Sequence, residues 1–111
     1  MKLPSDTVIA PEKLTKYLLV QREFDDKSQF LRQAGYTLDN WEQLKADLRL
    51  HVLPTEAAVI EQTDYGDLFE IRAALTGPNG KTLFVRTLWM HELRTGVTKF
   101  ITLYPDKRRL P

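Results

Sequence analysis

The chain has 111 residues, 42% hydrophobic and 28% charged, which is the composition of one soluble globular domain. It has no cysteine and two histidines, which excludes disulfides, thiol catalysis and cysteine-based zinc sites, and leaves too few ligands for a histidine-built metal site. We therefore expect no metal and no cofactor. No apolar run approaches the roughly 18 residues of a membrane span, and the N-terminus lacks the apolar core of a secretory signal, so we expect a cytoplasmic protein without membrane contact.

The net charge of +1 hides an asymmetry along the chain. Residues 1–67 carry 8 Lys/Arg against 12 Asp/Glu, whereas residues 68–104 carry 5 Lys/Arg against 2 Asp/Glu. We therefore expect an anionic partner at the second half of the chain. The alternative is that these basic residues only solvate an exposed surface.

Hydrophobic spacing of three and four predicts helices in the N-terminal half, after an irregular arm over residues 1–9. Asp26 has the chemistry of an N-cap, Gly35 that of a C-cap, and Pro54 stops the last helix. The helices are expected over about residues 11–20, 27–34 and 40–52.

From Ala58 the hydrophobic period changes to two, which predicts strands joined by short turns and hence an antiparallel meander. The strands are expected over residues 58–63, 68–75, 82–90 and 98–103. We predict a single α+β domain, residues 1–111, in which three N-terminal helices pack on one face of a four-stranded antiparallel sheet. The basic tail, residues 106–111, is expected to be flexible.

If helices cover one face of the sheet, a ligand would bind the other face. Alternation places Ile101 in the core and assigns several residues of the second and fourth strands to the open face. These are Glu70, Arg72, Thr98, Phe100, Thr102 and Tyr104. The third strand is apolar on both sides of Arg86, so alternation leaves the face of Arg86 undecided.

Two guanidinium groups beside hydroxyls would form a phosphate site, because arginine offers bidentate donors to tetrahedral oxyanions. Arg86, Thr102 and Tyr104 are the candidates on the last two strands, and Arg72 is a candidate binding residue on the second. In the alternative reading, Arg72 pairs with a nearby acid and Tyr104 is a packing residue.

Three further residues are candidates for the site. Lys27 and Lys81 are candidate binding residues, since both are basic. His51 would act as a general acid or base, because its pKa lies near neutrality. The alternative for His51 is a favourable interaction with the dipole at the C-terminus of its helix.

The segments EKLTKYLL, DKSQFL, LTGPNGKTLFVRTLWM and FITLYP together resemble a family of small uncharacterised bacterial domains of about 110 residues, frequent in cyanobacteria. The resemblance covers nearly the whole chain and implies no activity, because none is established for the family.

A second resemblance bears on function. Helices followed by an antiparallel meander that ends in T-x-Y-P are similar to the barnase–EndoU–colicin–RelE group of metal-independent ribonucleases and toxins. This similarity implies that Thr102 and Arg86 grip the scissile phosphate, while His51 or Lys27 moves protons.

Two functions follow from these observations. The first is a ribonuclease-like or toxin-system domain whose partner is RNA. The second is a non-catalytic interaction module that neutralises a toxin or docks another protein through the sheet. A small anionic ligand is a third option, and no feature of the sequence indicates DNA binding.

Overall fold

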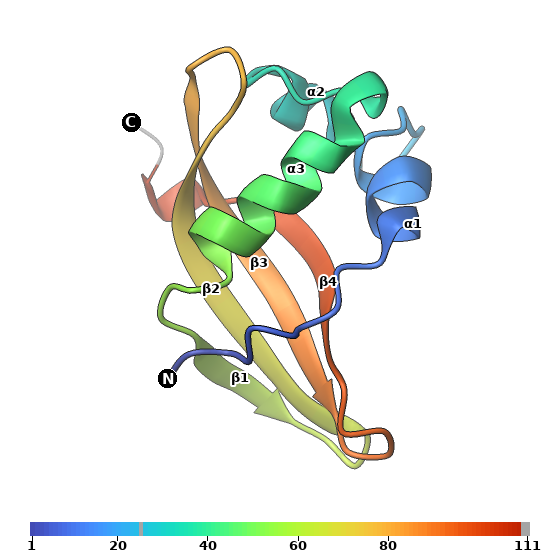
Figure 1. Cartoon of the computed structure of the whole chain (residues 1–111), viewed down its shortest axis with the longest axis vertical. Coiled ribbons are helices and arrows are strands. Elements are labelled where there is room, and N and C mark those ends of the chain that lie inside the picture. Colours follow the sequence, from blue (N-terminus) through green and yellow to red (C-terminus); the bar gives the residue numbers. More distant parts are fainter. Residues whose placement is uncertain (25, 110–111) are drawn as a thin grey trace.

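A computed structural model describes residues 1–24 and 26–109 of the chain. Its centre is a four-stranded antiparallel sheet in the order β1-β2-β3-β4 (Figure 1). The strands are β1 (Ala58–Gln62), β2 (Gly66–Thr76), β3 (Thr82–Glu92) and β4 (Thr98–Pro105). The predicted α+β class and antiparallel meander are therefore confirmed.

The prediction of three N-terminal helices packed on the sheet is wrong. The helical pieces are short, and most of their residues lie at 11–18 and in mid-chain at 38–52. They are α1 (Pro11–Lys13), η1 (Leu14–Leu18), α2 (Ser28–Arg32), η2 (Leu38–Asn40), α3 (Trp41–Asp47), η3 (Leu48–Val52) and η4 (Lys107–Arg109).

Two wide turns explain why the spacing predicted longer helices. In η1 the backbone N–H of Leu19 donates to the Leu14 carbonyl at 3.0 Å, and in η3 Leu53 donates to Leu48 at 2.8 Å. Each is a π-type turn. In each turn, the residues four and five positions after the carbonyl acceptor lie toward the same side. The residues that become buried in this way are Leu18, Leu19, Val52 and Leu53. Spacing alone does not distinguish such a turn from a regular helix.

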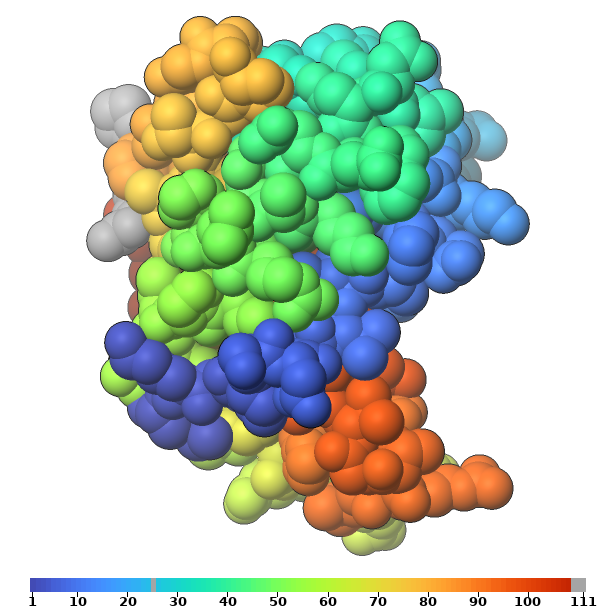
Figure 2. All heavy atoms as spheres, in the orientation of Figure 1, coloured from blue at the N-terminus to red at the C-terminus, as the bar shows by residue number. Residues whose placement is uncertain are grey.

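The core lies between the sheet and the N-terminal half of the chain. In β2 the side chains of Phe69, Ile71, Ala73 and Leu75 are buried, as the alternation predicts. Segment η3 contacts β2, and α3 runs across the same face (Figure 1). In the space-filling view, the helical segments and the N-terminal arm cover this side of the upper sheet (Figure 2).

A bulge in β4 changes which of its side chains point inward. Leu88 pairs with Thr102 but Trp89 pairs with Phe100, so Ile101 is an extra residue in the ladder. Phe100 is consequently buried against Trp89, with 5.1 Å between the ring centroids. The expectation that Phe100 and Thr98 lie on the open face is wrong, because strict alternation does not allow for the bulge.

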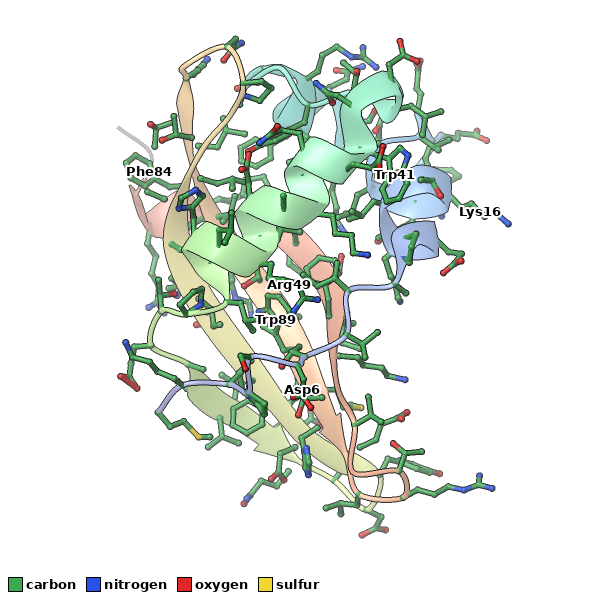
Figure 3. All side chains as sticks on the ribbon, viewed as in Figure 1. Asp6, Lys16, Trp41, Arg49, Phe84 and Trp89 are labelled. Carbon is green, nitrogen blue, oxygen red and sulfur yellow. The ribbon has the colours of Figure 1, made fainter. Side chains whose placement is uncertain are left out.

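Both ends of the described chain are attached to the sheet. In the N-terminal arm Val8 forms a parallel bridge with Lys99, beside β4. Arg49 donates to the carbonyls of Ser5 and Thr7 at 3.0 and 2.8 Å, and Figure 3 shows it pointing toward the arm. In the expected tail, Asp106 is buried and residues 107–109 form η4, while residues 110–111 lie outside the described residues. No helix in the described ranges is long and apolar enough to cross a membrane.

The bulge predicts unequal effects of truncating two neighbouring residues. Phe100→Ala should lower the free energy of unfolding by about 3–5 kcal/mol, the usual range for a buried phenylalanine. Ile101→Ala should lower it by about 1 kcal/mol, because Ile101 keeps part of its surface in water. Urea unfolding of both variants measures the difference. A larger loss for Ile101→Ala would contradict the assigned register.

A candidate anion-binding site

Two arginines lie directly opposite each other on the open face of the sheet. Arg72 of β2 is the cross-strand partner of Arg86 in β3. Like charges in this arrangement repel, so a compensating group is required. Glu70 supplies it: its Oε1 accepts from Arg72 Nε at 2.9 Å, and its Oε2 accepts from Arg86 Nε. The structure therefore decides the face of Arg86, which alternation left undecided.

The environment of Glu70 keeps its carboxylate charged. Burial by itself raises the pKa of Glu70, but the hydrogen bonds and charges of Arg86 and Arg72 outweigh burial and hold that pKa below its usual value. Both guanidinium groups are bound to Glu70 through Nε. Glu70 therefore orients both guanidinium groups, and its hydrogen bonds do not involve their Nη atoms.

Asp106 anchors the end of β4 beside this pair. Its Oδ1 accepts from Arg72 Nη1 at 2.5 Å and from the backbone N–H of Arg108 at 3.2 Å. Its own N–H donates to the Phe84 carbonyl at 2.8 Å. These bonds hold η4 against the sheet and place two more cations, Lys107 and Arg108, next to the arginine pair.

These groups border a shallow, open cleft of about 290 Å³. It is lined by Arg72, Arg86, Tyr104, Pro105, Asp106, Lys107 and Arg108. Four cationic side chains line the cleft, against the two carboxylates that contact them. The local charge is therefore positive by two, which suits an anionic ligand.

Tyr104 borders the cleft and has a second cation on its ring. Lys27 Nζ lies 4.2 Å from the centroid of the Tyr104 ring, and Arg86 Cζ lies 5.7 Å from it. Lys27, which is buried, also donates to the hydroxyls of Tyr17 at 2.8 Å and Thr102 at 3.0 Å. These interactions fix the position of the Tyr104 ring beside Arg86.

The structure thus brings together five of the seven residues that the sequence singled out. They are Lys27, Arg72, Arg86, Thr102 and Tyr104. The alternative reading for Arg72 holds as well, since Arg72 pairs with Glu70.

Two of the predicted site residues lie elsewhere. His51 is exposed in η3, which packs on the face of β2 opposite to Arg72. Lys81 is exposed in the turn between β2 and β3. Neither lines the cleft.

Sequence reasoning missed three functional candidates. Alternation placed Glu70 on the open face with Arg72, but Glu70 was not counted among the site residues. Asp106 and Arg108 were treated as part of a flexible tail, and no periodicity indicates that they fold back. No group of three or more His, Cys, Asp or Glu residues that could hold a metal occurs in the ranges 1–24 and 26–109.

The fold and the cleft define a small α+β domain with a cationic open sheet face. The chain belongs to the family described as a domain of unknown function (DUF6883), whose model matches residues 2–107. The match includes the N-terminal arm, the whole sheet and Asp106. No curated protein and no solved structure matches the chain.

The Glu70 bridge predicts a pH-dependent contribution to stability. Because the pKa of Glu70 is lowered on folding, its stabilising effect is complete above the unfolded value of about 4.3 and is lost as the pH falls through the folded value. At pH 7 Glu70→Gln should reduce the free energy of unfolding by about 2 kcal/mol, since both arginines lose a charged partner. Urea unfolding at pH 7 and pH 3 should show that this deficit shrinks in acid.

Glu92→Gln is the matched control for this experiment. Glu92 also has a lowered pKa, caused first by the hydrogen bond from Lys99, but that pair lies on the surface. Glu92→Gln should therefore reduce the free energy of unfolding less than Glu70→Gln does. A deficit for Glu70→Gln that is equal at both pH values would contradict the bridge.

Proposed function

We propose that the open sheet face binds RNA through its phosphates and cleaves the backbone in a ribonuclease-like reaction. The cross-strand pair Arg72 and Arg86 carries this proposal, because one shared carboxylate holds two like charges side by side at a cleft. The Nη groups of Arg86 and the Nη2 group of Arg72, whose Nη1 donates to Asp106, offer donors to phosphate oxygens. The resemblance of the meander and its closing T-x-Y-P to the barnase–EndoU–colicin–RelE group supports the same class of substrate.

The reaction that fits this cleft is an internal phosphoryl transfer. The 2′-hydroxyl oxygen forms a bond to phosphorus, the bond from phosphorus to the 5′-oxygen breaks, and the products are a 2′,3′-cyclic phosphate and a 5′-hydroxyl. Arg72 and Arg86 stabilise the negative charge that builds up on the phosphoryl oxygens. Tyr104 takes the proton-transfer role first considered for His51, because its ring is fixed beside Arg86. Tyr104 donates its hydroxyl proton to the leaving 5′-oxygen, while a water molecule accepts the proton of the 2′-hydroxyl and a proton from solvent restores Tyr104. Lys27 and Thr102 hold that ring in place.

The proposal predicts that RNA cleavage depends on the arginine pair. Purified protein is incubated with a single-stranded RNA in EDTA, and the products are resolved by length and end group. Arg86→Ala should slow cleavage by about 100-fold or more, the usual effect of removing a donor to the transition state. His51→Ala should leave the rate within about twofold, because His51 lies on the other side of the sheet.

Arg94→Ala is the matched control for lost charge, since Arg94 is exposed in the turn after β3, away from the cleft. Thermal unfolding of each variant shows that the fold is retained. Equal cleavage by wild type and Arg86→Ala would overturn the assignment of the site, and the absence of cleavage by wild type would overturn the enzymatic reading. If the domain acts as a toxin, expression of wild type in bacteria should slow growth more than expression of Arg86→Ala.

One observation favours a second function, the docking of an acidic protein. The open face next to the arginines carries half-exposed apolar side chains: Leu68, Leu88, Met90 and Ile101. A partner that presents a carboxylate to Arg86 and an apolar side chain to Leu88 would match both parts of this face.

Binding to two anionic polymers separates the two functions. Fluorescence titrations compare a single-stranded RNA with poly-L-glutamate at equal ionic strength. RNA should bind more tightly, and Leu88→Gln should change its affinity little, because phosphate contacts dominate RNA binding. Tighter binding of polyglutamate, weakened by Leu88→Gln, would favour the docking function instead.

A further inference from the structure

The carboxylate of Asp106 has one oxygen for which the described part of the chain, residues 1–24 and 26–109, supplies no hydrogen-bond donor. Asp106 is 1% exposed, and its Oδ1 accepts from Arg72 Nη1 and from the backbone N–H of Arg108. Its Oδ2 is buried and has no hydrogen-bond partner among the described residues. A buried carboxylate oxygen without a donor is unfavourable, and such atoms are rare in folded proteins. A donor from outside the described residues would satisfy Oδ2.

The position of Asp106 shows where that donor would come from. Asp106 lines the same cleft as Arg86, Lys107 and Arg108. The side chains of Lys107 and Arg108 at this cleft are exposed. A ligand that satisfies the whole cleft must carry an anionic group for the cations and, a few ångströms away, a hydrogen-bond donor for Asp106.

We propose that Asp106 recognises the ribose 2′-hydroxyl of a nucleotide whose phosphate lies on the arginine pair, Arg72 and Arg86. The 2′-hydroxyl is a donor next to the 3′-phosphate, and DNA lacks it. The site thereby selects ribonucleotides over deoxyribonucleotides. This inference rests on the proposed function for its ligand, RNA, but it does not require cleavage.

The test uses nucleotides that differ in the 2′ position and cannot be cleaved. Isothermal titration of the wild-type protein compares uridine 3′-monophosphate, its 2′-deoxy analogue and its 2′-O-methyl analogue. The last two should bind about tenfold or more weakly, because neither donates a hydrogen bond to the charged acceptor. The base is the same in all three, so recognition of the base cannot produce this difference. Equal affinities would overturn the inference and leave Oδ2 with a water molecule as its donor.

A variant locates the effect at Asp106. Asp106→Asn keeps the shape of the side chain, but its amide in place of Oδ2 donates a hydrogen bond, which the ether oxygen of the 2′-O-methyl analogue accepts as a hydroxyl does. The preference for the free 2′-hydroxyl over the 2′-O-methyl group should therefore disappear. Thermal unfolding and the NMR signal of the Arg108 N–H show whether η4 keeps its place. A preference for the free 2′-hydroxyl over the 2′-O-methyl group that persists in this variant would contradict the role of Asp106.

The same titrations separate this inference from the proposed function. Binding that is weakened by Arg86→Ala but is insensitive to the 2′ group would overturn only the role of Asp106. If neither the three nucleotides nor inorganic phosphate binds the wild-type protein, both proposals fail.

Discussion

The bulge at Ile101 shifts the inward-facing positions of β4 by one residue halfway along the strand. Before the bulge, Thr98 and Phe100 share the core face with Trp89. After it, Thr102 and Tyr104 share the open face with Arg86. One extra residue thus allows the strand to supply an aromatic core residue, Phe100, at one end and two polar side chains, Thr102 beside Lys27 and Tyr104 beside Arg86, at the other. The side chains that meet at the cleft depend on this shift in register.

The acids at the cleft explain why its cations can stand so close together. Glu70 joins the two arginines through Nε, and Asp106 holds Arg72 from the other side. Neither acid neutralises the cleft, because four cations remain against two carboxylates. A ligand would meet guanidinium groups that are already oriented, which reduces the entropy lost on binding. The acids therefore position the cations for an anion.

The sheet and much of the cleft could be predicted from the sequence because they depend on short-range patterns. Alternation in β2 placed Arg72 on the open face, and the change of hydrophobic period at Ala58 marked the start of the sheet. The predicted helices were too long and too regular, because π-type turns bury the same apolar side chains that a regular helix would bury. His51 was chosen for the chemistry of its side chain. Its position relative to the sheet depends on how η3 packs, which the sequence pattern does not reveal. Asp106 could not be predicted, because its burial follows from long-range contacts with Arg72 and Phe84.

The pairing of Val8 with β4 makes the two edges of the sheet unequal. Val8 donates to the Thr98 carbonyl and accepts from the Phe100 N–H, both at 2.8 Å, so the arm occupies backbone groups along that edge. At the opposite edge, all five residues of β1 are exposed. Free strand edges are the templates on which chains associate. If copies of the chain aggregate by adding strand to strand, growth should therefore start at β1, where the irregular pairing between Val59 and Glu61 and the charge of Glu61 oppose it.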